Sequence, residues 1–376
     1  MRIKVRAEDF RVEEKIKVGH TKDDCIVLML EKTNWDTIGV IKVMARKLHI
    51  SQKRIGYAGL KDKRAVTKQK VSISGVDKEK VEALTISRVC ISDIERGDCI
   101  HLGDHLGNNF DILVRDSTVR DDRIERIRKG FPNYFGQQRF GDVRPITHEV
   151  GKQLINQDFE GAALIFLAKP FPEEKYYDVR KELWETGDYE KAKKVFPVTL
   201  RYERALLDRI HLGAKEAFKA LPVRLNTLFI HAYQAYLFNE IVKERCRNVP
   251  VTEVEEGDVV ISWINGKKVT TLAGKHNRER IVREGLCAAA PIVGYKTQVR
   301  GRMKEITESL LEKEGIKMED FLIKEFPSLS SRGTYREILG KATDIEYVYE
   351  KEGVRIKFYL PKGEYATVFL GELFKT

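Results

Sequence analysis

A single carboxylate lies within a strongly basic segment of this chain. Between Asp36 and Asp77 the only acidic residue is Asp62, in the loop GLKDKRA. Ten bases accompany it within a short stretch: Lys42, Arg46, Lys47, Lys53, Arg54, Lys61, Lys63, Arg64, Lys68 and Lys70. A carboxylate can act as a nucleophile or general base, and clustered cations bind phosphates. The pattern indicates a phosphate-binding surface around one reactive carboxylate, although a solvated basic face with a turn-forming aspartate would give the same pattern.

Motifs for other kinds of chemistry are missing from the sequence. It has no P-loop, no GxGxxG after a strand pattern, no GxSxG elbow and no HExxH. The eight histidines lack ligand spacing, and the five cysteines form no CxxC pair. We therefore expect a reaction that needs no metal and no cofactor, and cysteines that stay reduced rather than forming a disulfide framework.

Composition indicates a cytoplasmic protein with a polyanionic partner. The 376 residues carry 68 Lys and Arg against 57 Asp and Glu, a net charge of +11. No apolar run approaches the roughly 20 residues that cross a membrane, and the opening MRIKVRAEDF has no apolar signal core. A chain of this length is expected to form two domains.

Hydrophobic periodicity predicts an α+β protein. Strands are expected at 25–30, 54–58, 66–74, 88–94 and 109–115, with helices at 36–49 and near 119–129. Beyond about residue 155 we expect helices at 158–168, 180–196, 225–246 and 303–314. This region also holds one hairpin, VVISWINGKKVTTL, whose Asn265-Gly266 fits a type I′ turn. Strands return after about residue 342, so the pattern suggests a sheet domain interrupted by a helical insertion.

Six segments occur in a specific order: EDFRVEE (8–14), GYAGLKDKRAVTKQ (56–69), GNNFDILVR (107–115), PNYFGQQRFG (132–141), HAYQAYLFN (231–239) and LPKGEYAT (360–367). In these segments the chain resembles the TruD family of tRNA pseudouridine synthases, and GLKDKRAVT closely matches the catalytic loop of that family. The resemblance implies a mixed, mainly antiparallel sheet domain built from residues 1–155 and 335–376. It also implies a helix-rich TRUD insertion domain over 156–334.

The activity implied by this resemblance is the isomerisation of a uridine in tRNA, at position 13, without cofactor or metal. The N1–C1′ bond breaks, the uracil turns, and C5 joins C1′. Asp62 matches the reactive carboxylate, and Lys4, six residues before Phe10, matches its cationic partner. A neighbouring cation lowers the pKa of a carboxyl group and favours its charged form. Direct attack of Asp62 on C1′ and a glycal route through the 2′-proton are both left open.

The resemblance also implies which residues hold the base. Phe135 would stack on the uracil, Asn133 would arrange the loop, and Tyr365 would line the pocket. Core packing is the alternative for the two aromatic residues, and a turn residue is the alternative for Asn133. The aromatic stripe of Tyr233 and Tyr236 on the 225–246 helix is interpreted as core.

The expected partner is tRNA, with no membrane and no obligate protein partner. Lys61, Lys63 and Arg64 flank Asp62, so phosphate contacts there would bring the ribose toward it, and Arg139 is a further phosphate-binding candidate. One rival is a non-catalytic RNA-binding or assembly protein of the same fold. Another is a nuclease or methyltransferase, which would need a metal-binding carboxylate cluster or a cofactor loop.

Overall fold

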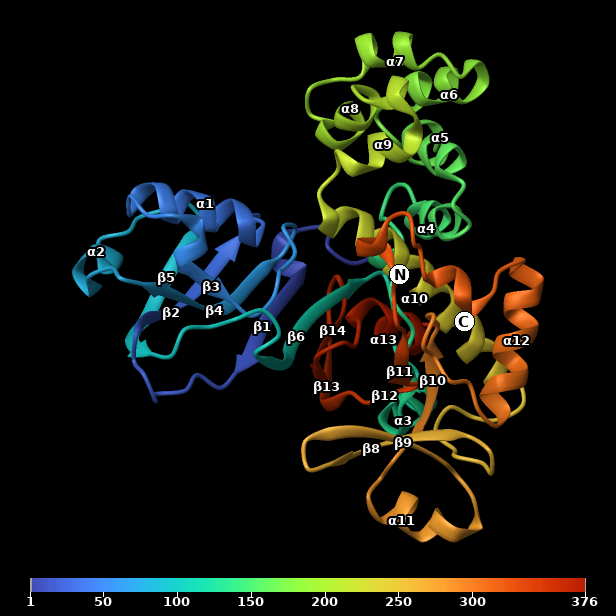
Figure 1. Ribbon diagram of the computed structural model, residues 1–376. Helices are drawn as coiled ribbons and strands as arrows, with labels where there is room; N and C mark the ends of the chain where they lie inside the picture. The colour runs from blue at the N-terminus through green and yellow to red at the C-terminus, as the bar shows by residue number, and fades with distance from the viewer. Residues whose placement is uncertain (1, 376) are drawn as a thin grey trace. The chain divides into compact units, whose positions relative to one another are not determined.

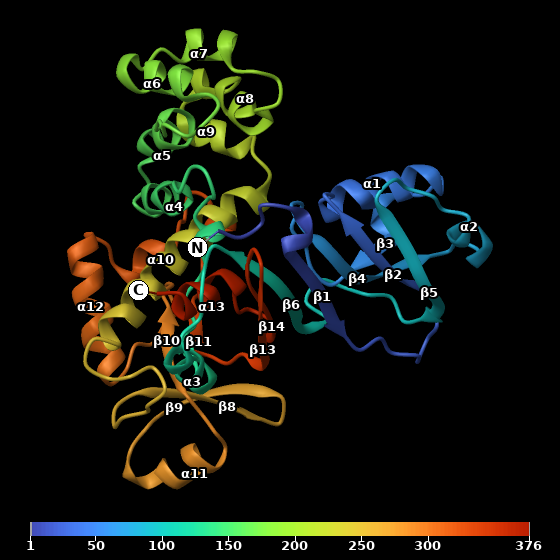
Figure 2. The same cartoon turned by 180° about the vertical axis from the view of Figure 1, so that it is seen from behind.

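The computed structural model describes residues 2–375 and contains two compact units (Figures 1 and 2). The sheet unit consists of the chain up to Phe131 and of the chain from Lys341 onward, and the insertion unit spans Pro132–Gly340. These divisions differ from the bounds expected from sequence, 155 and 335. One reason is that α4 (Thr147–Ile155) packs its apolar face into the core of the insertion unit.

The sheet unit is built on an eight-stranded mixed sheet with the order β13-β14-β6-β1-β4-β2-β5, in which β3 pairs with β4. The strands are β1 (Phe10–Ile16), β2 (Cys25–Thr33), β3 (Ile55–Tyr57), β4 (Val66–Ser74), β5 (Val89–Gly97), β6 (His105–Arg115), β13 (Thr343–Glu350) and β14 (Gly353–Pro361). β1 and β4 run parallel, and the other described strand pairs of this sheet are antiparallel. The α+β class and the mainly antiparallel sheet are thus confirmed.

Four helices accompany this sheet: α1 (Thr37–Lys47), α2 (Lys78–Glu82), α3 (Asp121–Lys129) and α13 (Ala366–Leu373). The side chain of Asp36 caps α1 by accepting a hydrogen bond from the amide of Gly39. Ile41 and Met44 lie on the apolar face of α1 and pack on β2 and β4. The helices expected at 36–49 and near 119–129 are therefore present.

The insertion unit combines helices with a second sheet. Its helices are α4, α5 (Phe159–Ala168), α6 (Tyr177–Thr186), α7 (Tyr189–Val195), α8 (Arg201–Leu207), α9 (Ala214–Lys219), α10 (Val223–Arg245), α11 (Arg278–Arg283) and α12 (Arg302–Glu314). The four-stranded sheet has the order β11 (Thr334–Glu337), β10 (Ala288–Ile292), β8 (Val259–Ile264), β9 (Lys267–Leu272). Two short strands, β7 (Phe131–Pro132) and β12 (Leu339–Gly340), lie where the chain passes between the units.

Two expectations for the insertion unit have different outcomes. The helix predicted over 180–196 is wrong as one element, because Gly187 adopts φ +66° and separates α6 from α7. The predicted hairpin is present as β8–β9, and Asn265 (φ +50°) and Gly266 (φ +73°) have the positive φ values of a type I′ turn. Among residues 2–375, no helix is both long and apolar enough to span a membrane.

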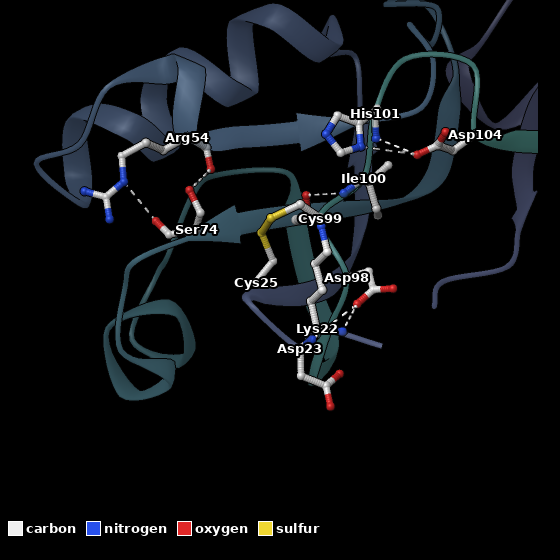
Figure 3. Close-up of a disulfide and its surroundings, with 11 residues drawn as sticks. Lys22, Asp23, Cys25, Arg54, Ser74, Asp98, Cys99, Ile100, His101 and Asp104 are labelled. Atoms are coloured by element: carbon white, nitrogen blue, oxygen red, sulfur yellow. Dashed lines mark hydrogen bonds and ion pairs between the residues drawn. A yellow bond between two sulfur atoms is a disulfide. The ribbon is translucent and has the colours of Figure 1, made fainter. Parts of the chain in front are cut away.

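Cys25 and Cys99 form a disulfide, so the expectation of reduced cysteines is wrong for this pair (Figure 3). Their Cα atoms lie 5.2 Å apart although 74 positions separate them in sequence. Cys25 begins β2 directly opposite Gly97 of β5, and this register brings the two cysteines together. Sequence spacing alone does not reveal a strand register, which is why the pair was missed.

The disulfide anchors the segment that follows β5. In this segment, Ile100 packs against Ala58 and donates its amide to the hydroxyl of Ser72 (2.8 Å). The amide of Gly103 donates to the carbonyl of Ala58 (2.8 Å). The disulfide therefore restrains a segment that supports the residue immediately before the GLKDKRA loop.

Replacing Cys25 and Cys99 together with Ala should lower the free energy of unfolding by about 2–4 kcal/mol, because the cross-link closes a long loop of the unfolded chain. Denaturant unfolding with and without reductant measures this. Cys90→Ala, which removes an exposed thiol of β5, serves as the control and should change little. Equal stability of the oxidised and reduced wild type would contradict a role for the cross-link.

Candidate active site

The loop that carries Asp62 connects β3 to β4 and is held by buried polar side chains. The amide of Lys61 donates to the hydroxyl of Thr37 (2.9 Å), and this hydroxyl donates to the amide oxygen of Gln69 (3.0 Å). The side-chain nitrogen of Gln69 in turn donates to the carbonyl of Gly59 (3.1 Å). Thr37 and Gln69 are both buried. A satisfied buried network of this kind favours one conformation of the loop.

The side chain of Lys32 reaches the same loop from β2 and is fully buried. Its ammonium donates to the carbonyl of Asp62 (3.0 Å), to that of Trp35, and at 3.5 Å to that of Lys61. Burial lowers the pKa of Lys32 to about 8, and the charges of Asp36 and Asp62 oppose this decrease. A cation thus lies directly against the backbone of the candidate catalytic residue.

The structure pairs Asp62 with Lys4. The Lys4 ammonium forms an ion pair with the Asp62 carboxylate, and the two side chains are 25% and 28% exposed. The same ammonium lies 4.2 Å from the centroid of the Phe10 ring, where a cation–π interaction adds to its orientation. Lys4 has a φ of +58°, an uncommon value for a residue other than glycine. The partly exposed carboxylate is both accessible to a substrate and fixed by a cation.

Lys61, expected to bind phosphate, points into the protein instead. Its side chain is 7% exposed, and its ammonium lies 2.6 Å from the fully buried carboxylate of Glu14 and 2.8 Å from the Asn108 side-chain oxygen. Glu14 is on β1 and Asn108 on β6, so this ion pair ties the loop to the sheet. Lys63 and Arg64 are exposed. The geometry leaves these two as phosphate-binding candidates and gives Lys61 a positioning role.

Asn133 and Phe135 lie together in the insertion unit. The amide of Phe135 donates to the Asn239 side-chain oxygen (2.8 Å), and the Asn239 side-chain nitrogen donates back to the carbonyl of Phe135 (3.0 Å). The Phe135 ring is partly buried and packs edge-on against Phe238, with 5.4 Å between the ring centroids. Asn133 is buried and donates to the carbonyl of Glu337 (3.2 Å). Asn133 thus holds the loop next to Phe135.

Arg336 on β11 contacts both of these residues and was not identified from the sequence. Its guanidinium donates to the Asn133 side-chain oxygen (2.6 Å) and lies 4.3 Å from the centroid of the Phe135 ring. Arg139, expected to bind phosphate, lies 5.5 Å from the same ring centroid. Arg336 lies outside the motifs that carried the resemblance, so no sequence signal marked it.

The remaining residues divide between the two units. Tyr365 is partly buried and directly precedes α13 in the sheet unit. Its role in lining a pocket stays a prediction. Four positioning residues of the sheet unit were not predicted from the sequence: Glu14, Lys32, Thr37 and Gln69. The period-two pattern of β2 contained a signal for Lys32, because it follows Leu28 and Leu30 on the buried face of the strand.

Possible metal ligands converge in one place among the described residues. This group consists of Asp24, Cys25 and Cys99. Its two sulfur atoms are joined in the disulfide and are therefore not thiolates that could bind a metal.

Comparisons with known proteins agree over the whole chain. The family model for TruD, tRNA pseudouridine synthase D, matches residues 1–373. Proteins named as probable tRNA pseudouridine synthase D from Archaeoglobus fulgidus and Thermococcus sibiricus are 39% and 37% identical, and each match covers 100% of this chain and 94% of the relative. The crystal structure of a TruD protein from Methanosarcina mazei superposes with a TM-score of 0.83 at 32% identity, covering 100% of this chain and 93% of that one.

Lys32→Met should make the pH dependence of stability differ from that of the wild type. The pKa of Lys32 is about 8 in the folded protein, whereas its ordinary value, expected in the unfolded chain, is 10.5. Between these pH values the unfolded chain therefore binds more protons than the folded protein, and stability rises with pH. The wild type should therefore gain about 1–3 kcal/mol relative to the variant as the pH rises from 8 to 10.5.

Denaturant unfolding of both proteins at several pH values measures this difference. Lys63→Met, which removes an exposed lysine of the same loop, provides the baseline. A stability difference between wild type and Lys32→Met that stays constant across this range would contradict the buried, shifted ammonium.

Proposed function

Because the chain belongs to the TruD family of tRNA pseudouridine synthases, we propose that it isomerises uridine 13 of tRNA with Asp62 as the reactive carboxylate. The observation that carries this proposal is the ion pair of Asp62 with Lys4 in a loop fixed from beneath by buried side chains. A nucleophile or base must be ionised and held still, and an adjacent cation in a fixed loop favours both conditions.

In the direct route, the Asp62 carboxylate attacks C1′ of the ribose. The N1–C1′ bond breaks, and uracil leaves with the bonding electrons as an anion. After the uracil turns, C5 attacks C1′ and the bond to Asp62 breaks, which returns the electron pair to the carboxylate. C5 then loses its proton and N1 gains one, so the product has the composition of the substrate. In the glycal route Asp62 removes the 2′-proton as uracil leaves, so that a C1′–C2′ double bond forms. Asp62 returns the proton to C2′ when C5 joins C1′, and it must likewise begin ionised.

The role of Lys4 is to keep Asp62 charged and oriented until the substrate arrives. A cation next to a carboxylate favours its ionised form, and the effect is strong where solvent is partly excluded. The Lys4 ammonium lies against the Phe10 ring, which limits the conformations that the Lys4 side chain can adopt. Lys4 therefore acts on the carboxylate rather than on the substrate base.

Binding of the target nucleotide would use exposed cations and an aromatic ring. Lys63 and Arg64 flank Asp62 and are exposed, so contacts to phosphates on either side of the uridine would bring its ribose to the carboxylate. Phe135 would stack on the uracil, with Asn133 and Arg336 holding its loop. Tyr365 is proposed to line the uridine-binding pocket of the sheet unit, and Arg139 to contact phosphate.

Asp62→Asn should reduce single-turnover pseudouridine formation by roughly 10³-fold or more, because the amide has the same shape but is neither a base nor a nucleophile. Folding and tRNA affinity should change little. Asp77→Asn, at an exposed position of the same unit, is the matched control and should react like the wild type. Retention of a tenth of the wild-type rate by Asp62→Asn would exclude Asp62 as the reactive group.

Phe135→Ala should slow modification roughly 5- to 150-fold, the range that corresponds to 1–3 kcal/mol of base–aromatic stacking. Phe238→Ala removes the buried neighbour of Phe135 and should instead cost about 3–5 kcal/mol of folding stability. Thermal melting and single-turnover kinetics of both variants separate the two effects. The stacking role fails if Phe135→Ala melts as early as Phe238→Ala while its folded fraction reacts normally.

A further inference from the structure

A second basic segment lies in the insertion unit, away from the Asp62 loop in sequence. Residues 259–304 contain ten Lys and Arg but only two acidic residues, Glu279 and Glu284. Acidic residues elsewhere offset this charge, so it is not visible in the composition of the whole chain. The segment forms β8, β9, α11 and β10 and the beginning of α12 (Figure 1).

The β8–β9 hairpin of this segment presents an exposed tryptophan beside a lysine. Trp263 is 68% exposed, and it lies directly opposite Lys268 in the antiparallel register. Side chains opposite one another in such a pair project from the same face of the sheet. Proteins that bind single-stranded nucleic acid use such a combination: a base stacks on the exposed aromatic ring, and the neighbouring cation binds the phosphate backbone.

A cavity of about 190 Å³ lies on the same sheet. Lys296 and Arg300 line it together with hydroxyl-bearing residues, and none of the described residues that line it is acidic. The hydroxyl-bearing residues are Thr270, Thr271, Thr297, Thr334 and Tyr335. The hydroxyl groups of Thr297 and Tyr335 already donate to the carbonyls of Ile292 and Gln298. The two cations and the hydroxyl groups of Thr270, Thr271 and Thr334 suit a phosphate, which accepts hydrogen bonds on several oxygens.

Lys268 connects the hairpin to the rim of this cavity. Its ammonium donates to the Thr334 hydroxyl (3.3 Å) and to the carbonyl of Tyr335, and both residues line the cavity. Trp263 and the cavity therefore belong to one continuous surface, which we name the hairpin surface. A larger cavity in the sheet unit, about 470 Å³, differs in charge. Its lining has three cations (Arg11, Lys68 and Lys357) against five carboxylates, which suit a phosphate less well: Glu13, Glu31, Asp111, Asp344 and Glu346.

We propose that the hairpin surface binds a second segment of the tRNA, with a base stacked on Trp263 and a phosphate held by Lys296 and Arg300. This inference rests on the proposed function in taking tRNA as the substrate. The Asp62 loop acts on one nucleotide, whereas a surface on a separate unit adds affinity through the rest of the molecule. Most contacts of such a surface go to the backbone, so it positions the RNA rather than reading its sequence.

Tryptophan fluorescence during titration with an unmodified tRNA transcript tests the stacking. The chain has three tryptophans, Trp35, Trp184 and Trp263. Quenching by tRNA should be lost in Trp263→Phe and retained in Trp184→Phe, which replaces an exposed tryptophan of α6 in the same unit. Heparin, a polyanion without bases, should not reproduce the quenching. Unchanged quenching in Trp263→Phe, or equal quenching by heparin, would overturn the stacking.

Affinity measurements test the phosphate site. Trp263→Ala should weaken tRNA binding roughly 5- to 150-fold. Lys296→Ser combined with Arg300→Ser should reduce the slope of log affinity against log salt by about 0.7 to 0.9, since the contacts to one phosphate are lost. An unchanged slope would overturn the phosphate site.

Mapping pseudouridine with the same proteins separates this inference from the proposed function. Pseudouridine formation by the wild type without quenching of Trp263 refutes the hairpin surface and leaves the proposed function standing. Quenching of Trp263 with no pseudouridine formed supports the surface and refutes the reaction.

Discussion

The candidate site depends on the hydrogen bonds that the buried ammonium of Lys32 donates to backbone carbonyls. This ammonium lies beneath the loop between β3 and β4 and donates to the carbonyl of Asp62 itself. Burying a cation without partners costs free energy. As long as Lys32 is charged, the backbone carbonyls that accept its hydrogen bonds must therefore stay close to it. The side chains of Thr37 and Gln69 fix the amide of Lys61 and the carbonyl of Gly59 in the same loop. The proposed reactive carboxylate is therefore positioned by buried groups of the protein.

The basic residues around Asp62 have different roles, and whether a residue is buried or exposed determines which role it can have. Lys32 and Lys61 are inside, where one holds backbone carbonyls and the other is paired with Glu14. Lys63 and Arg64 are exposed and can meet phosphates. Loss of a buried member leaves a charge or a carbonyl without its partner, whereas loss of an exposed member would remove a proposed contact to the RNA. Proximity in sequence to a reactive residue is thus a poor guide to function unless burial is known.

Sequence periodicity predicted the main strands and helices, except that the helix expected over 180–196 is two helices. The motifs predicted the family and the ion pair of Asp62 with Lys4. The α+β class, α1 and the β8–β9 hairpin follow from local patterns. What could not be predicted depends on register and tertiary packing. The Cys25–Cys99 disulfide requires the pairing of β2 with β5, and the contact of Arg336 with Asn133 joins residues 203 positions apart. The hairpin surface could not be predicted from the net charge, because acidic residues elsewhere in the chain offset the positive charge of residues 259–304.

Mapping of pseudouridine in an unmodified tRNA transcript tests the central claim most directly. The purified chain is incubated with the transcript in buffer without metal ions or other additives, and every uridine position is then examined. We expect conversion of uridine 13 alone, in an amount that approaches one per tRNA as the reaction proceeds. An absence of pseudouridine under these conditions, or conversion at other positions with uridine 13 intact, would contradict it.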